Sequence, residues 1–433
     1  MIHLSFIQTH HIKQVLKRVL PLRVVNVLRK KKERRLLSFY TRSSVLPFRP
    51  ERFPLGINLI GFIQGENGLG QSCRLLAKNI QTAGIPFTIY PITQASLENN
   101  ETAWDKYFDF HAPFGINVIH VNPLEMPSTI TKSYRSLLDN RYNIGFWLWE
   151  MECFPDRWLD RLAWLDEIWT PSEFISCGIR QKTKLPVYSI PYGLEAPLDP
   201  TCDRKRFGLP EDVFLFLIIG DGRSVVERKN PLGAVKAYVN AFLPSDCSVG
   251  LVLKLAQIDV ETLRKIHSLL DGYPNIIWIN NILPKEMINS LIKCVDVLLS
   301  LHRSEGFGLV MAEAMLLGIP VVSTNWSANT EYMDRTIACM LDYRIVTLQR
   351  DIPPYSKGDC WADPDIMHAT RCMQKLRDDP IFYSALAEKA KSHIATHLSP
   401  ARMGYLLRER VDAIMPSILA TPHRDIERKQ THG

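Results

Sequence analysis

The most informative stretch of the chain is residues 303–315, which read RSEGFGLVMAEAM. The apolar run before it indicates a strand that ends near Ser300, and the two glycines around Phe307 indicate a turn. A helical pattern then begins at Leu309. A strand, a tight turn and a helix in this order are the repeating unit of parallel α/β sheets.

Two acidic side chains and a run of backbone amides come together in this stretch. Glu305 lies in the turn and Glu313 in the first turns of the helix, and both carboxylates can accept hydrogen bonds from hydroxyls. The amides of Gly308, Leu309 and Val310 would point at an anion, because the start of a helix favours negative charge. The combination suits a polyhydroxylated, phosphorylated ligand. The structural alternative is a glycine turn before a helix that carries an acid near its start.

Outward from this stretch, strand and helix patterns alternate in two series, which a polar, proline-containing segment at 197–211 separates. The first series predicts strands at 57–63, 87–90, 117–121, 144–148 and 187–190, with helices at 128–138, 157–165 and 173–183. The second predicts strands at 213–219, 249–255, 276–279, 295–300 and 320–323, with helices at 231–241, 260–270, 285–294 and 309–317. Helical patterns then fill 363–376, 380–397 and 400–414.

We therefore expect an α/β protein with two doubly wound, Rossmann-like domains that face each other across a cleft. The expected division is a basic extension at 1–55, domains at 56–198 and 199–362, and C-terminal helices at 363–433 that pack back across the domains.

Three cations follow the strand expected at 213–219: Arg223, Arg228 and Lys229. Ligands of open α/β sheets bind at the carboxyl ends of the strands. Fixed cations at that edge could neutralise a leaving diphosphate. A solvated loop with local ion pairs to Glu227 is the structural alternative.

A second glycine loop, QGENGLGQ at 64–71, follows the first strand and precedes a helix. It has neither the GxGxxG nor the GxxxxGK[ST] spacing, so an NAD or ATP site is poorly supported. Both a loop at a substrate cleft and a plain tight turn remain open for Gly68 and Gly70.

Composition excludes several classes of protein. The 433 residues are 46% hydrophobic and 22% charged, which rules out disorder as the dominant state. No apolar run approaches the roughly 18 residues of a membrane span, and we expect no signal peptide. The nine cysteines include no CxxC pair, so we expect neither a disulfide framework nor a zinc ribbon. We expect instead that the cysteines are reduced in the cytoplasm.

The net charge of +7 is concentrated at the N-terminus. Residues 1–55 contain 13 Lys and Arg against two Glu, a charge of +11, while the remainder is −4. Apolar residues recur there at helical spacing between positions 16 and 28. A basic segment of this kind can lie on an anionic membrane surface. A solvated tail remains an alternative, and nucleic acid is the least favoured partner because no aromatic residues are interleaved.

Over roughly residues 56–340, the chain resembles the retaining nucleotide-sugar glycosyltransferases of family 4, which have the GT-B fold. The matching segments include EGFGLVMAEAM, in which seven residues separate Glu305 from Glu313, and GIPVVSTNWSANTEYM. GLGQSCRLLAKNI, PYGLE and GDGRSVVERKNP match as well. The segment IGFWLWEMECFPDRW is similar to members of a bacterial polysaccharide-assembly subgroup.

The resemblance implies a role for each matching residue. Glu305 would hold hydroxyls of the donor sugar and Glu313 the ribose, while Arg223 and Lys229 would bind the diphosphate. The donor-binding set also contains Gly306, Phe307, Gly308, Leu309 and Val310 of the turn, Lys254 as a further cation, and Gly68 and Gly70 of the first loop.

Two positions depart from the family pattern. Asn122 stands where many relatives have a histidine that contacts the donor, and His120 is a weaker match for that role. Ala328 stands where relatives usually have glycine. The catalytic set implied by the resemblance is therefore Glu305, Arg223, Lys229 and Asn122.

The resemblance implies a mannosyltransferase-like hexosyltransferase of cell-envelope polysaccharide biosynthesis. It would transfer a sugar, with retention of configuration, from a nucleotide diphosphate donor to a hydroxyl of a glycan or lipid-linked glycan. No cofactor is implied, no DxD motif is present and no metal site is expected. We expect a cytoplasmic protein, peripheral at the inner face of the membrane, with no nucleic-acid partner. The alternatives are a non-catalytic GT-B-like subunit that binds sugar or polymer, and a nicotinamide oxidoreductase, whose dinucleotide fingerprint is absent.

Overall fold

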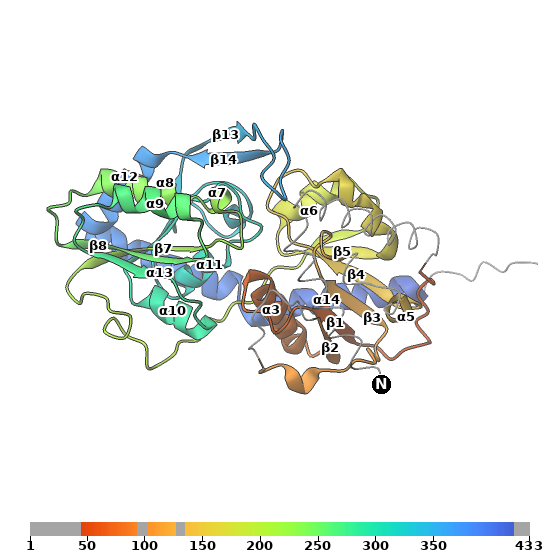
Figure 1. The fold of residues 1–433 in the computed structure, drawn as a ribbon. Helices are drawn as coiled ribbons and strands as arrows, with labels where there is room; N and C mark the ends of the chain where they lie inside the picture. The colour runs from red at the N-terminus through yellow and green to blue at the C-terminus, as the bar shows by residue number, and fades with distance from the viewer. Residues whose placement is uncertain (1–44, 93–101, 127–134, 420–433) are drawn as a thin grey trace, which may run out of the picture.

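The computed structural model describes residues 45–92, 102–126 and 135–419 (Figure 1). Residues 1–44 of the basic extension lie outside the described residues. So does most of the helix expected at 128–138, of which α5 (Arg135–Leu138) is described.

The first sheet, in the N-terminal domain, has six parallel strands in the order β2-β1-β3-β4-β5-β6. Its strands are β1 (Ile57–Gly61), β2 (Phe87–Pro91), β3 (Ile116–His120), β4 (Tyr142–Phe146), β5 (Glu167–Thr170) and β6 (Val187–Ser189). The helical elements between them, besides α5, are α3 (Gly68–Thr82), η1 (Asp105–Tyr107), η3 (Asp156–Trp164) and α6 (Glu173–Arg180).

The second sheet, in the C-terminal domain, has the parallel order β12-β11-β10-β7-β8-β9. Its strands are β7 (Phe214–Asp221), β8 (Val249–Ala256), β9 (Ile276–Ile279), β10 (Val297–Ser300), β11 (Val321–Thr324) and β12 (Cys339–Leu341). Its helical elements are α7 (Val226–Lys229), α8 (Pro231–Ala241), α9 (Val260–Leu269), α10 (Lys285–Lys293), α11 (Leu309–Leu316) and η4 (Ala328–Glu331). The prediction of two Rossmann-like domains and a helical C-terminal segment is confirmed.

Continuous apolar strands explain why both sheets could be found from the sequence. Every residue of β8 is buried, and its only charged side chain is Lys254. A parallel strand with a helix layer on each face has no solvent side, so its sequence is apolar throughout rather than alternating.

Three features differ from the sequence prediction. The short strands β5 and β12 were not predicted, and the helix expected at 157–165 is the 3-10 helix η3 at Asp156–Trp164. The chain also forms an unpredicted antiparallel hairpin of β13 (Tyr343–Thr347) and β14 (Cys360–Pro364). Most of β13 is exposed, so it lacks the apolar pattern that marks the core strands.

The two domains are joined by long-range contacts as well as by the linker. Helices α12 (Ile366–Asp378) and α13 (Pro380–His397) pack on the C-terminal domain, and α14 (Pro400–Leu419) then returns to α3 of the N-terminal domain (Figure 1). There Arg410 Nε donates to Glu167 Oε1 at 2.7 Å.

The loop between β13 and β14, residues 348–359, forms a second connection, which we call the strap. Figure 1 shows the hairpin extending from the C-terminal domain toward α6 of the other domain. Leu348 and Tyr355 of the strap belong to the same buried cluster as Trp149 and Trp158 of the N-terminal domain. The strap therefore packs into the core of the opposite domain.

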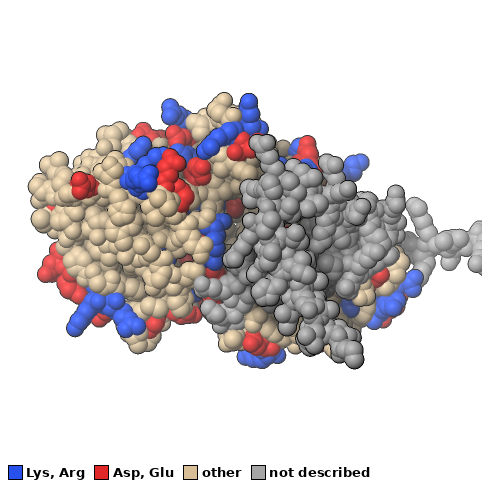
Figure 2. All heavy atoms as spheres, viewed as in Figure 1, with Lys and Arg blue, Asp and Glu red and all other residues tan. Residues whose placement is uncertain are grey.

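Figure 2 shows Lys and Arg side chains next to Asp and Glu along the upper edge of the C-terminal domain, near the hairpin. Ion pairs join Arg344 to Asp363 and Arg350 to Glu227 there, so this edge carries both signs of charge. Within the described part of the chain, no helix has the length and apolar character needed to cross a bilayer.

The first glycine loop is fixed by close backbone packing. The Asn67 side chain caps α3 by accepting a hydrogen bond from the Gly70 amide at 2.8 Å. The buried Arg74 guanidinium donates to the carbonyl oxygen of Gly65 at 3.1 Å. A Cβ on Gly70 would lie 1.9 Å from that same oxygen, whereas a Cβ on Gly68 would meet nothing within 4 Å.

Gly70→Ala should therefore lower the free energy of unfolding by about 1–3 kcal/mol, the usual cost of overpacking, because backbone atoms would have to move. Gly68→Ala is the matched control, and it should leave stability unchanged or raise it by up to about 1 kcal/mol. Urea unfolding of both variants measures the difference. Equal stability of the two variants would contradict the tight loop.

Candidate active site

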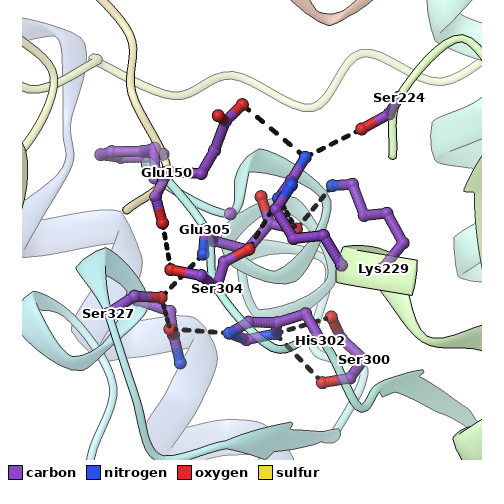
Figure 3. A network of polar contacts seen from close by, with 12 residues as sticks. Glu150, Ser224, Lys229, Ser300, His302, Ser304, Glu305 and Ser327 are labelled. Carbon is purple, nitrogen blue, oxygen red and sulfur yellow. Dashed lines mark hydrogen bonds and ion pairs between the residues drawn. The ribbon is translucent and has the colours of Figure 1, made fainter. Parts of the chain in front are cut away.

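Glu305 lies in the loop between β10 and α11, and its side chain is only 9% exposed (Figure 3). Its Oε1 atom accepts from Lys229 Nζ at 2.5 Å and lies 3.2 Å from Arg228 Nη1. Within the described residues, Oε2 has no hydrogen bond or ion pair of its own. Burial by itself would raise the pKa of this carboxyl, but the two cations outweigh it and hold the pKa at about 2. Glu305 is therefore an anion at neutral pH.

Two hydrogen bonds hold the segment that contains both cations next to the Glu305 loop. Helix α7 ends at Lys229, and the next residue, Asn230, has a left-handed conformation with a φ of 52°. This turn lets α8 begin in a new direction. The Asn230 amide group donates to the Leu301 carbonyl at 2.9 Å, and the Arg303 amide donates to the Arg228 carbonyl at 2.7 Å. These bonds hold α7 and the turn after it against the segment that follows β10, where Glu305 lies.

The opposite side of the Glu305 loop is held by the segment after β11. The Glu305 amide donates to Ser327 Oγ at 2.8 Å, and the Ala328 amide donates to the Glu305 carbonyl at 3.3 Å. His302 is fully buried, with Nε2 3.1 Å from Asn329 Oδ1. Burial lowers the pKa of His302, so its ring is neutral when it supports the loop. Alanine at position 328 is fully buried and takes part in this support.

The start of α11 supplies the amides that the sequence predicted. Gly308 precedes the helix with a φ of +88°, and a Cβ there would lie 2.3 Å from Met311 Cε. The amides of Leu309 and Val310 fall in the first turn, where a helix has no intrahelical acceptors for them. This turn, which also contains Phe307, can present two donors to an anion.

Glu313 lies on α11 and is completely buried. Its Oε2 atom pairs with Lys285 at the start of α10. Among the described residues, its Oε1 atom has no hydrogen-bond partner. Buried polar atoms are nearly always satisfied, so this orphan acceptor is suited to a hydroxyl from a ligand.

Arg223 is directed to the N-terminal domain and not to Glu305. Its Nη2 atom donates to Asp221 Oδ2 at 2.6 Å and to the Glu66 carbonyl of the first glycine loop at 3.0 Å. Lys254 lies near the same Asp221, and burial lowers the pKa of its ammonium while the carboxylate opposes this. The structure thus brings the predicted cations to one edge of the sheet, where they pair with different groups.

Asn122 and His120 both support the N-terminal domain. The Asn122 Oδ1 atom accepts from the Leu148 amide at 2.9 Å, which fixes the loop after β4. His120 is fully buried, with Nε2 2.7 Å from Ser72 Oγ, and burial lowers its pKa to about 4. Neither side chain has a recorded contact with Glu305, so a direct role of Asn122 at a donor stays a prediction.

The Glu305 loop also contacts the N-terminal domain. The Gly306 carbonyl accepts from Ser172 Oγ at 2.8 Å, and Ser304 Oγ donates to the Glu150 carbonyl. The Phe307 ring meets the Tyr192 ring edge-on, with centroids 4.9 Å apart. The site is therefore enclosed by both domains.

Three residues of this site were not assigned a role from the sequence: Glu150, Lys285 and Tyr355. Arg228 was expected among the cations for a diphosphate, but nothing in the sequence indicated that it, with Lys229, would face Glu305. Glu150 stood in the matching Trp-Glu segment without a role. No pattern marked Lys285 or Tyr355, because their partners lie far away in the chain.

The arrangement offers two acidic acceptors, the cations Arg228, Lys229 and Lys285 that pair with them, and the start of α11. Carboxylates suit sugar hydroxyls, and the cations and amides suit phosphate. Among residues 45–92, 102–126 and 135–419, no cluster of three His, Cys, Asp or Glu is placed to hold a metal ion.

Comparison with known proteins gives a family match over part of the C-terminal domain. Residues 254–343 match the family model described as glycosyl transferases group 1. That segment contains Glu305, Glu313 and Lys254. No curated protein matches the sequence.

Several solved structures share the whole fold. HepE from Anabaena, in complex with UDP and glucose, has a TM-score of 0.59 at 12% identity. The match covers 83% of this chain and 100% of the HepE chain. Sucrose-phosphate synthase from Thermosynechococcus elongatus also scores 0.59, at 13% identity, covering 84% and 100%. A glycosyltransferase from Rickettsia africae scores 0.58 at 13% identity, covering 85% and 99%. At such identities the likeness establishes the fold, which is GT-B.

The depressed pKa of Glu305 gives a pH-dependent prediction. Because its folded-state pKa lies near 2, below the ordinary 4.5, its charge stabilises the native state above about pH 4.5. That stabilisation is lost as the pH falls from 4.5 toward 2. Glu305→Gln should therefore lower the free energy of unfolding at pH 7 by about 3 kcal/mol.

Denaturant unfolding of the parent and the Gln variant at several pH values tests this. The difference between the two proteins should shrink as the solution becomes more acidic. A difference that stays constant from neutral pH to pH 3 would contradict the ion cluster.

Proposed function

We propose that this protein is a retaining glycosyltransferase. It transfers a hexose from a nucleoside diphosphate sugar to a hydroxyl of a glycan or lipid-linked glycan. The observation that carries the proposal is Glu305, an anion buried between two cations at the cleft edge, together with the unpartnered buried oxygen of Glu313 on the adjacent helix. Both carboxylates can accept hydrogen bonds from hydroxyls, and a nucleoside diphosphate sugar has hydroxyls on the hexose and on the ribose.

In this proposal the donor lies across the C-terminal domain. The ribose hydroxyls donate to Glu313, the diphosphate lies at the start of α11, and the hexose hydroxyls donate to Oε2 of Glu305. The resemblance to family 4, the matching glycosyl transferase segment and the UDP-bound neighbour of the same fold support a nucleotide-sugar donor.

Charge on the diphosphate grows as the bond to the sugar breaks, so cations beside it favour the transition state over the bound donor. Lys229 is suited to this, because its side chain is 32% exposed and carries a flexible ammonium that can turn from Glu305 toward phosphate. Arg223 can supply a second cation from the same loop. These cations take the place that a divalent metal has in other transferases, so we propose a metal-independent reaction.

Retention follows, in this proposal, from departure and attack on the same face of the sugar. The protein then orients the reactants and neutralises charge, and no side chain forms a covalent bond. The N-terminal domain presents the acceptor, and the contacts between the domains limit the access of water to the donor, so that hydrolysis is slow but still measurable.

The donor assignment is tested by nucleotide-sugar binding. UDP-glucose and GDP-mannose, with a wider panel behind them, should be screened by thermal shift, since a ligand that binds only the native state raises its melting temperature. Glu313→Gln should weaken binding of the best donor about 10- to 100-fold, the value of one hydrogen bond to a charged group.

The matched control is Glu261→Gln, which removes a carboxylate from an exposed ion pair with Lys265 on the same domain. This variant should bind the donor like the parent. Unchanged affinity in a folded Glu313→Gln variant would remove Glu313 from the donor site, and no shift with any nucleotide sugar would contradict the proposed function.

We further propose that the basic extension holds the enzyme at the inner face of an anionic membrane, where a lipid-linked acceptor would be found. Each Lys or Arg near such a surface contributes about 1 kcal/mol, and salt screens the attraction. Deletion of residues 1–44 leaves the contacts of Leu46 with Asp139 and of Arg49 with Asn140 in place. The deletion should therefore preserve donor binding and abolish binding to anionic vesicles.

Vesicle sedimentation with and without anionic lipid, at low and high salt, measures this. Equal binding of the full chain and the deletion variant would leave the extension without a membrane role.

A further inference from the structure

Glu150 belongs to the N-terminal domain, in the loop after β4, yet it contacts three separate segments of the C-terminal domain. Its carbonyl oxygen accepts from Ser304 Oγ of the Glu305 loop (Figure 3). Its Oε1 atom lies 3.7 Å from Arg228 Nη2 on α7. Its Oε2 atom accepts from the Tyr355 hydroxyl of the strap at 3.1 Å.

Arg228 lies between the two acids. Its Nη1 atom donates to the Ser304 carbonyl at 2.6 Å and faces Glu305 at 3.2 Å, while its Nη2 atom donates to Ser224 Oγ at 2.8 Å and faces Glu150. The side chain is only 4% exposed. Because the guanidinium is planar and rigid, a carboxylate that fixes one edge also fixes the other.

Tyr355 reaches Glu150 from the strap. Its ring is buried, with its centroid 5.3 Å from that of Trp149 and 6.2 Å from that of Trp361. Burial raises the pKa of its hydroxyl well above the ordinary value, so the group stays protonated and can donate. The strap thus holds Glu150 through one hydrogen bond whose loss would not alter the ring packing.

We infer that Glu150 is a positioning residue, which fixes Arg228 from the opposite domain and thereby holds Glu305 in its sugar-binding orientation. This inference rests on the proposed glycosyltransferase function. It follows that binding of the nucleotide does not depend on Glu150, whereas the orientation of the sugar for transfer does.

The test uses Glu150→Gln, which removes the charge and keeps the shape, and Tyr355→Phe, which removes only the hydroxyl. Release of nucleoside diphosphate from UDP-glucose, or from GDP-mannose if the parent prefers it, is followed with water as the acceptor. We expect kcat to fall about 10- to 100-fold in Glu150→Gln and less in Tyr355→Phe. The affinity for UDP or GDP should stay within about twofold. The double variant should be no slower than Glu150→Gln, because Tyr355 acts through Glu150.

Arg157→Ala is the matched control. From the N-terminal domain, Arg157 donates to Ser356 Oγ at 3.1 Å and to the Pro354 carbonyl, so it holds the strap without a recorded contact with Glu150. Its variant should keep the parent kcat. A loss in Arg157→Ala as large as in Tyr355→Phe would assign the effect to strap docking and overturn the inference.

Two further outcomes distinguish failure of this inference from failure of the proposed function. A parent protein that turns over while Glu150→Gln and Tyr355→Phe match its kcat would overturn the inference alone. A parent that neither binds nor hydrolyses any nucleotide sugar would overturn the proposed function and the inference with it. If thermal unfolding shows that Glu150→Gln does not fold, Tyr355→Phe decides by the same comparison.

Discussion

The buried carboxylate of Glu305 is the constraint on which the rest of this site depends. A carboxylate that is 9% exposed is too costly to keep ionised unless cations and hydrogen bonds replace the lost water. Arg228 and Lys229 supply the charge, and the turn at Asn230 and the Ser327 segment hold the two sides of the loop. Helix α7 and the segments that follow β10 and β11 are thereby fixed to one another around a single charge.

The same loop is also part of the interface between the domains. Ser172, at the natural capping position of α6, donates its hydroxyl to the Gly306 carbonyl instead of capping its own helix. The cap comes from Glu331 of the other domain, whose carboxylate accepts from the amides of Glu173 and Phe174 at 2.9 and 2.7 Å. A conformation that separates the domains would lose these contacts together, so the geometry at Glu305 and the closure of the cleft are coupled.

Local patterns in the sequence were enough to predict the two sheets and the placement of Glu305 and Glu313 beside the start of α11. Apolar strands and glycine turns leave a signal within a few residues. The pairing of Glu313 with Lys285, of Arg228 with Glu305 and of Glu167 with Arg410 leaves none, because each joins segments from 28 to 243 residues apart. The hairpin and the strap were not predicted for a related reason. The exposed strand β13 has no apolar pattern, and the buried residues of the strap pack into the other domain.

The central claim is that Glu305 and Glu313 bind the sugar and the ribose of one donor. The most direct measurement is a crystal structure of the full chain with an intact nucleoside diphosphate sugar. The account predicts hexose hydroxyls within hydrogen-bonding distance of the Glu305 carboxylate, a ribose hydroxyl on Glu313 Oε1, and the Lys229 ammonium turned toward the diphosphate. A nucleotide sugar bound with neither carboxylate in contact, or bound away from the start of α11, would contradict it.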